Sequence, residues 1–239
     1  MKTACLSFFN FMMRCLRLPM LVAAGYLACM PANSQQVQDK FEKKVLEYEA
    51  ADKAQASPRG AILFAGDSQF YRWKTLAEDL PDYTILNRGI DSFQFSNLLQ
   101  YMDRLVLPYE PRLIVLHIGG NDVHNGRTAE QILADFKTFV ARVRDAHITA
   151  PIVFSSITPG PGRWDEAPQR QHVNQTIQKY IATQPDLRFI DLWSAMLTSD
   201  GQPREDLWVE DRVHPNHAGY LIRVKLTRPF LGEPDKRDR

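Results

Sequence analysis

The chain has 239 residues, of which 44% are hydrophobic, and its 29 basic residues nearly balance its 28 acidic residues. This length and apolar content give one domain of ordinary size, with enough chain to bury a core. The near-neutral charge lacks the basic excess of proteins that bind nucleic acids or anionic membranes, so we expect neither as a partner.

The first 34 residues are typical of a cleavable signal peptide. Lys2, Arg14 and Arg17 supply positive charge, residues 18–29 form an apolar stretch, and small residues follow at 32–34. The apolar stretch is shorter than the roughly 20 residues that span a bilayer. We therefore expect an exported protein, periplasmic or secreted, without stable membrane insertion once the leader is removed.

All three cysteines, Cys5, Cys15 and Cys29, lie in this leader. The remaining chain then has no thiol for a disulfide, a metal site or a cysteine nucleophile. It has 26 basic and 28 acidic residues, a net charge of −2. A lipid anchor through Cys29 is an alternative to cleavage, but Tyr26 stands where a lipobox requires Leu or Val.

Residues 35–59 are expected to form an amphipathic helix and a linker. Apolar residues at Val37, Phe41, Val45 and Tyr48 recur at helical spacing among charged residues. The sequence Ser-Pro-Arg-Gly at 57–60 then ends the pattern. The main domain is expected over residues 60–232, followed by a polar tail at 233–239.

Within the main domain, short apolar runs alternate with longer segments of helical periodicity. The predicted strands are 61–65, 84–86, 113–118, 152–157 and 189–192, and the predicted helices are 73–80, 95–106, 129–146, 168–182 and 216–230. This alternation predicts an α/β fold with a parallel sheet covered on both faces. Because the carboxyl ends of such strands share one edge, we look for the active site there.

The first predicted strand ends in Gly66-Asp67-Ser68. Glycine permits a tight strand-to-helix turn, and a serine at the helix start presents its hydroxyl beside backbone N–H groups, as a nucleophile requires. The same tripeptide also fits a simple helix cap, since Asp and Ser are favoured there. Asp67 is interpreted as bracing this turn.

The next two strands are followed by Gly89 and by Gly119-Gly120-Asn121-Asp122. The Gly89 backbone amide and the Asn121 side-chain amide could join the Ser68 amide as an oxyanion hole. Turn geometry alone also accounts for a glycine or an asparagine at a strand end.

Near the end of the chain, Asp211 and His214 lie three residues apart in a predicted loop. Histidine titrates in the range that a general base needs, and a carboxylate on its second nitrogen fixes the tautomer. We therefore expect His214 to face Ser68 with Asp211 behind it. His117 is interpreted as a core or cleft-wall residue, and His217 as a residue of the last helix without a carboxylate partner.

These blocks, taken in order, resemble those of the SGNH/GDSL hydrolases. The resemblance implies a flavodoxin-like three-layer α/β/α sandwich with a five-stranded parallel sheet, and no metal or organic cofactor. It implies a serine ester hydrolase that forms an acyl-serine intermediate, with Ser68 as nucleophile, His214 as base and Asp211 as its partner. Ser68, Gly89 and Asn121 would donate to the oxyanion, and the substrate would be a small-molecule or glycan ester.

The sequence departs from the family pattern at two points. Gln69 stands where the family name implies Leu, and Asp91-Ser92 stands where many relatives carry a second glycine, so that Asp91 could crowd or acidify the oxyanion hole. Residues 94–97 and 159–170, which include Trp164, are candidates for substrate contact. Arg88, beside Gly89, could contact a substrate, but it is interpreted as a solvated charge.

Two other functions remain open from the sequence. A metal-dependent phosphoesterase could use the set Asp67, Asn121, Asp122, His214 and His217, although the Asp-x-His and His-x-His patterns of such enzymes are missing. A non-catalytic, exported glycan-binding protein could share the fold. The substrate's acyl chain, its alcohol and the oligomeric state are not predicted.

Overall fold

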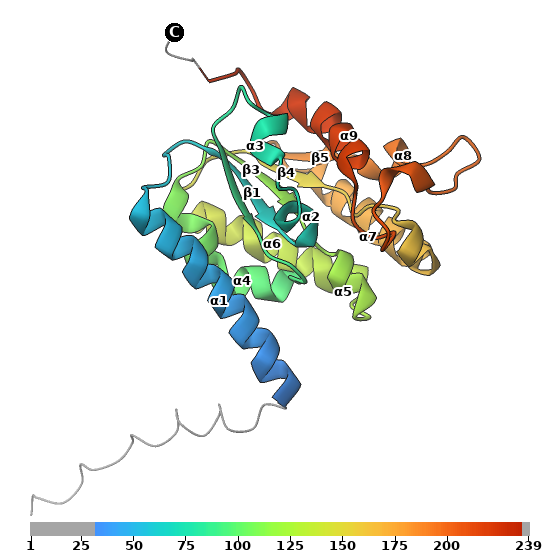
Figure 1. Ribbon diagram of the computed structural model, residues 1–239, viewed down its shortest axis with the longest axis horizontal. Coiled ribbons are helices and arrows are strands. Elements are labelled where there is room, and N and C mark those ends of the chain that lie inside the picture. The colour runs from blue at the N-terminus through green and yellow to red at the C-terminus, as the bar shows by residue number, and fades with distance from the viewer. Residues whose placement is uncertain (1–31, 236–239) are drawn as a thin grey trace, which may run out of the picture. The chain divides into compact units, whose positions relative to one another are not determined.

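A computed structural model of the chain describes residues 32–235 (Figure 1). Residues 1–31 of the predicted leader, including its three cysteines, lie outside this range, as do residues 236–239 of the tail. The chain divides into two units after Lys40; of the first, the structure describes only the start of helix α1 (Ala32–Ala54). The second unit, residues 41–239, contains the sheet.

Within the described residues, five parallel strands form one sheet in the order β2-β1-β3-β4-β5. Their bounds are β1 (Ile62–Gly66), β2 (Ile85–Gly89), β3 (Leu113–His117), β4 (Ile152–Ser155) and β5 (Leu187–Ile190). This confirms the predicted five-stranded parallel sheet. The central strands β1, β3 and β4 are buried along their whole length, which is why their sequences are apolar up to the last residue (Gly66, His117 and Ser155) rather than alternating.

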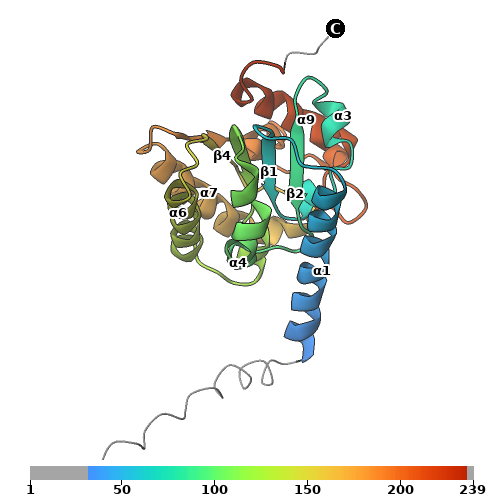
Figure 2. The ribbon, with the colours of Figure 1, turned by 90° about the vertical axis from the view of Figure 1, so that its left-hand side faces the viewer.

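Helices cover both faces of the sheet (Figures 1 and 2). On one face, apolar residues of α1, α4 (Phe95–Leu105), α6 (Ala129–Asp145) and α7 (Ala167–Ile181) pack against alternate strand residues such as Leu63 and Leu116. On the other face, α3 (Leu76–Asp79) and α9 (His217–Thr227) pack against Phe64 and Val115. The three-layer sandwich thus follows from helices with one apolar stripe each.

Shorter elements connect these layers. They are α2 (Ser68–Tyr71), α5 (Gly120–His124), α8 (Leu192–Ala195) and the 3-10 helices η2 (Leu107–Tyr109), η3 (Pro161–Glu166), η4 (Glu205–Leu207) and η5 (Arg228–Phe230). None of the helices in residues 32–235 combines the length and apolarity that a membrane span requires.

Arg88 corrects the expectation of a solvated charge. It lies on the edge strand β2, is only 5% exposed and forms an ion pair with Asp52 of α1 at 2.5 Å. Its guanidinium lies over the rings of Tyr48 and Tyr109, and the Tyr48 hydroxyl donates to the Gly89 carbonyl at 2.6 Å. A buried cation needs such partners, so Arg88 fixes α1 to the edge of the sheet rather than contacting solvent.

Candidate active site

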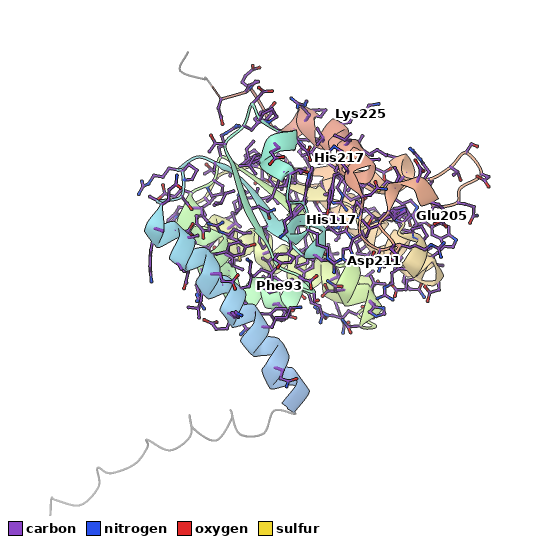
Figure 3. All side chains as sticks on the ribbon, viewed as in Figure 1. Phe93, His117, Glu205, Asp211, His217 and Lys225 are labelled. Atoms are coloured by element: carbon purple, nitrogen blue, oxygen red, sulfur yellow. The ribbon has the colours of Figure 1, made fainter. Side chains whose placement is uncertain are left out.

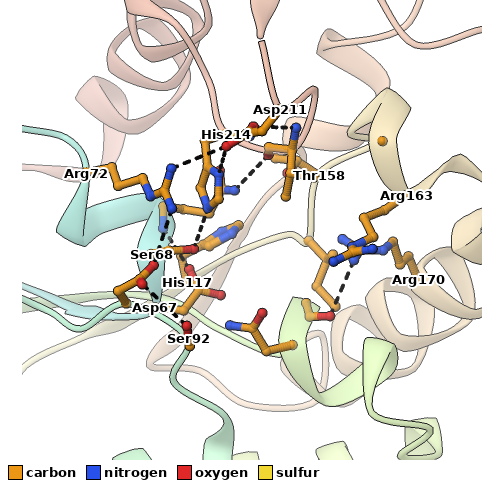
Figure 4. Close-up of a pocket in the computed structure, with 17 residues that line it drawn as sticks. Asp67, Ser68, Arg72, Ser92, His117, Thr158, Arg163, Arg170, Asp211 and His214 are labelled. Atoms are coloured by element: carbon orange, nitrogen blue, oxygen red, sulfur yellow. Dashed lines mark hydrogen bonds and ion pairs between the residues drawn. The ribbon is translucent and has the colours of Figure 1, made fainter. Parts of the chain in front are cut away.

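A cavity of about 420 Å³ opens at the carboxyl ends of β1 and β3 (Figure 4). The chain passes from β1 to β2 on one side and then returns to place β3 on the other side of β1. Ligands of open α/β sheets bind at this reversal of strand order. The cavity is lined by Ser68 from the β1 end, Asn121 from the β3 end and His214 from the last loop.

The turn after β1 explains how Ser68 reaches the cavity. Gly66 has a φ of +149°, and a Cβ at this position would lie 1.9 Å from the His117 carbonyl oxygen, so only glycine fits. Asp67 then caps α2, its carboxylate accepting the Gln69 N–H at 2.9 Å. Ser68 is therefore the first residue of a helix, with its side chain on the cavity wall.

The structure brings Ser68, His214 and Asp211 together in series. The Nε2 atom of His214 lies 2.9 Å from the Ser68 hydroxyl oxygen, and its Nδ1 atom lies 2.7 Å from Asp211 Oδ2. Figure 4 shows the ring of His214 between the other two side chains. The hydroxyl, the imidazole and the carboxylate are thus within hydrogen-bond reach, an arrangement that can activate a serine hydroxyl.

The Asp211 carboxylate is held in its charged form. Although partial burial would raise its pKa, hydrogen bonds from the backbone amides of His214 and Val213 and from the His214 ring lower the pKa of Asp211 to about 2. Arg72 adds an ion pair at 3.2 Å. The carboxylate can therefore stabilise a positive charge on the ring without taking its proton.

Asp67 and His117 lie behind Ser68 and are 3% and 2% exposed. Burial raises the pKa of Asp67 to about 7, although the Gln69 N–H and the charge of Arg223 act in the opposite direction. Burial also lowers the pKa of His117 well below its ordinary value, which keeps this ring neutral. Asp67 braces the turn, as expected, and His117 forms part of the cleft wall.

Asn121 lies in the first turn of α5 and lines the cavity. Its side-chain nitrogen donates to the Phe93 carbonyl at 2.9 Å, which fixes the orientation of the amide. An amide nitrogen carries two hydrogens, so a second donor is available to a ligand. The position fits the predicted oxyanion donor.

Gly89 does not fit its predicted role. Its N–H donates to the Asn87 side chain at 2.9 Å, and among the described residues that line the cavity Ser92 is present and Gly89 is not. A Cβ on Gly89 would lie 2.4 Å from the Tyr71 backbone nitrogen. This glycine therefore lets α2 approach β2, whereas Ser92, with a φ of +67°, lines the same cavity as Ser68.

The close approach at Gly89 predicts that Gly89→Ala destabilises the fold. The added methyl group would press on the α2 backbone, which cannot rotate away as a flexible side chain can. We expect a loss of about 1–3 kcal/mol and a fall in Tm of roughly 3–10 °C, measured by thermal unfolding. The matched variant Gly120→Ala, where the added Cβ would meet Arg170 at an ordinary 3.5 Å, should change Tm little. Equal effects of the two substitutions would contradict this reading.

Of the two segments predicted to contact substrate, one lines the cavity. Gly162, Arg163 and Arg170 come from residues 159–170. Residues 94–97 instead begin α4, where the side chains of Gln94 and Asn97 form a capping box, and none of these residues is among the described cavity lining.

Trp164, a candidate for substrate contact, and His217, the other histidine near the end of the chain, are not among the described residues that line the cavity. Trp164 stacks on Trp193 with ring centroids 5.8 Å apart. His217 is an exposed residue at the start of α9, and Figure 3 shows it apart from Asp211. His214 is therefore the histidine that the structure places against Ser68.

Two arginines of the cavity lining make contacts that the sequence did not predict. Arg72 follows α2 and pairs with both Asp211 and Asp91, at 3.2 and 3.7 Å, so the charge of Asp91 is compensated at the cleft mouth. Arg170, 6% exposed, pairs with Glu166 at 2.7 Å and donates to the Gly120 carbonyl. The pair with Glu166 is local and Arg170 lies in the predicted segment 159–170, whereas the contacts of Arg72 with Asp211 and of Arg170 with Gly120 join residues far apart in the sequence and leave no local pattern.

The metal-site alternative required a cluster of acidic and histidine side chains. Within residues 32–235, no group of three or more His, Cys, Asp or Glu side chains is arranged to hold a metal ion. Asp122, one of the suggested ligands, is fully buried and accepts the Phe95 backbone N–H and the Arg127 guanidinium instead.

Comparison with known proteins identifies a protein family that matches most of the chain. The profile of the GDSL-like Lipase/Acylhydrolase family matches residues 50–222. No curated protein matches the chain.

Three solved structures of related fold align with this chain over nearly the whole of their own length. A Streptococcus pneumonia protein described as a candidate platelet activating factor has 24% identity and a TM-score of 0.72, covering 84% of this chain and 100% of its own. A GDSL-like lipase from Bacteroides thetaiotaomicron has 20% identity and a TM-score of 0.69, covering 78% and 96%. A catalytic mutant of an acetylxylan esterase from Geobacillus stearothermophilus has 17% identity and a TM-score of 0.62, covering 76% and 98%.

Proposed function

The chain belongs to the GDSL-like lipase/acylhydrolase family and is a carboxylic ester hydrolase, and from that premise we propose that Ser68, His214 and Asp211 are its catalytic residues. The observation that carries this proposal is the series of contacts from Asp211 through the His214 ring to the Ser68 hydroxyl, at 2.7 and 2.9 Å. The series lies on the wall of the cavity at the β1 and β3 ends.

In this mechanism the Ser68 oxygen attacks the ester carbonyl carbon while His214 Nε2 accepts its proton. Asp211 stabilises the resulting imidazolium through Nδ1. The tetrahedral intermediate then collapses, the C–O bond to the alcohol breaks, and His214 returns the proton to the leaving oxygen. Water, activated by His214 in the same way, attacks the acyl-Ser68 ester and releases the acid.

The developing oxyanion needs donors that are already in place. We propose the Ser68 backbone amide at the start of α2, the free side-chain hydrogen of Asn121 and the backbone amide of Ser92, which replaces Gly89 in this role. Ser68, Asn121 and Ser92 all line the cavity. Each donor of this kind typically contributes on the order of 3 kcal/mol to lowering the barrier.

The lining of the cavity favours a short acyl group on a polar alcohol. Among the described residues, Ile157 and Val213 are its aliphatic side chains, whereas Arg72, Arg163 and Thr158 add polar groups. A long acyl chain needs a continuous apolar wall to leave water, and this lining does not offer one. An acetylated sugar or another short ester fits the polar wall, and the predicted leader is consistent with a substrate outside the cytoplasm.

A panel of 4-nitrophenyl esters tests this assignment. We expect kcat/KM to be highest for acetyl or propionyl and to fall at least about 10-fold by octanoyl, because added methylenes find no apolar wall. Acetyl release from acetylated xylo-oligosaccharides, measured in parallel, tests the polar alcohol. A preference for dodecanoyl or longer esters would contradict the short-acyl proposal. Phosphodiester hydrolysis that a chelator abolishes would instead support the phosphoesterase.

A further inference from the structure

Gln69, the residue after the nucleophile, links two distant segments of the chain. Its side-chain Nε2 donates to the Val213 carbonyl at 3.1 Å, and its Oε1 accepts from Arg223 Nη2 at 2.5 Å. Gln69 is 6% exposed and Arg223, on α9, is 1% exposed. Three elements therefore meet at one buried amide: α2, α9 and the loop that carries His214.

The chemistry of the two partners fixes the orientation of this amide. A guanidinium can only donate and a carbonyl oxygen can only accept, so the side chain between them must accept at one end and donate at the other. Glutamine meets both requirements. Leucine, which the family name implies at this position, meets neither, and a buried hydrogen-bonding group without a partner is costly.

The hydrogen bond from the buried guanidinium of Arg223 holds the Gln69 side chain strongly. Burial lowers the pKa of Arg223 to about 10, while the charge of Asp67 acts in the opposite direction. Within the described residues, Nε and Nη1 of Arg223 have no hydrogen-bond partner, and its Nη2 donates to Gln69. Hydrogen bonds to a charged donor are stronger than neutral ones, which holds the Gln69 side chain in place.

The other end of the link reaches the residue next to His214. Apart from the contact between His214 and Ser68 itself, other bonds of this loop are internal, such as Val209 N–H to the His214 carbonyl, or lead to η3 and η4, such as Gly162 N–H to the Arg212 carbonyl and Arg212 to Glu205. Arg72 also connects the end of α2 to Asp211, but its side chain is 43% exposed and solvent weakens that contact. Gln69 thus supplies the buried connection between the helix of Ser68 and the loop of His214.

We propose that Gln69, held by Arg223, is a positioning residue that sets the distance between the His214 ring and the Ser68 hydroxyl. This inference rests on the proposed catalytic roles of those two residues. Gln69 does not touch the reacting atoms in this mechanism. It acts by fixing the backbone at Val213, so its loss should affect the chemical step more than substrate binding.

Gln69→Glu is the sharpest test, because it keeps the shape of the side chain and the acceptor for Arg223. It removes the donor to the Val213 carbonyl and places a second oxygen against it. We expect kcat for a short ester to fall about 10- to 100-fold, since displacements near 1 Å cost about that much. KM should stay within about 3-fold, and Tm should stay near that of the wild type. Gln69→Leu should lower both kcat and Tm.

Gln178→Glu, on the exposed face of α7, controls for the added charge and should leave all three quantities unchanged. The rate of labelling by a fluorophosphonate should fall with kcat in Gln69→Glu, because both depend on serine activation. Wild-type kcat in Gln69→Glu, with Ser68→Ala inactive, would overturn the inference and leave the proposed function intact. A fall in kcat that only accompanies a matching loss of Tm in both Gln69 variants would also overturn it.

Discussion

Ser68→Ala should abolish ester hydrolysis, with kcat reduced on the order of 10⁴- to 10⁶-fold. The substitution removes the oxygen that lies 2.9 Å from His214 Nε2, and no acyl-enzyme can then form. The backbone amide of Ser68 and the side chain of Asn121 remain, so a small residual rate from the oxyanion donors is expected. A fluorophosphonate probe should label the wild type at this position and leave the variant unlabelled.

Ser194→Ala is the matched control for this experiment. Ser194 is an exposed serine on α8, and its backbone N–H rather than its hydroxyl is bound by Asp191. It should retain both labelling and turnover. Labelling of Ser68→Ala at the wild-type level, or turnover within about 10-fold of the wild type, would show that another group is the nucleophile. The mechanism proposed above would then be wrong.

The strands and long helices were predictable because their patterns are long or continuous. The run at 113–118 is apolar apart from His117, and its residues Leu113–His117 form β3, buried on both faces. The segment 129–146 repeats its apolar residues at helical spacing, and it forms α6, whose N-terminus is fixed by a capping box at Thr128. Helices α2, α5 and α8 have only four or five residues. A helix so short does not complete the repeat on which periodicity depends.

The candidate triad was predictable because each member lies at a strand end or in a short motif with its own chemistry. The proposed oxyanion donor after β2 was not predictable, because a glycine and a serine lie three residues apart in one turn. The sequence does not reveal that Gly89 faces the α2 backbone whereas Ser92 adopts a φ of +67° beside the cavity. The three-dimensional structure is needed to tell that Gly89 packs against α2 and that Ser92 lies beside the cavity.

Contacts between polar residues that lie far apart in the sequence could not be predicted from the sequence. Gln69 and Arg223 are 154 positions apart, and Arg88 meets Asp52 across 36 positions. Arg88 is buried with its charge compensated by Asp52, whereas Arg223 is buried with the neutral amide of Gln69 as a hydrogen-bond acceptor. Neither pair leaves a local pattern, so Arg88 was expected in solvent and Gln69 was seen only as a departure from the family.

Asp211→Asn should reduce kcat/KM about 10²- to 10⁴-fold, because the ring of His214 loses the charge that stabilises its protonated form. KM should change much less than kcat. Glu205→Gln removes a nearby carboxylate that pairs with Arg212 outside the cavity lining, and it should leave the kinetics unchanged. Equal activity of Asp211→Asn and Glu205→Gln would contradict the role assigned to Asp211.

The pH dependence of this pair adds a second test. The folded-state pKa of Asp211 is lowered from 3.8 to about 2, so its ionised form stabilises the fold at any pH above about 4, and this contribution is lost as the pH falls from 4 towards 2. The difference in Tm between wild type and Asp211→Asn should therefore be largest at pH 7 and shrink below pH 4. Since Asp211 stays charged throughout the range of an esterase assay, its titration should not produce the acid limb of the activity profile. An acid limb between pH 5 and 7 that disappears in Asp211→Asn, together with a difference in Tm that changes over pH 5–7 instead of below pH 4, would mean that the carboxylate is protonated far more easily than its hydrogen bonds allow.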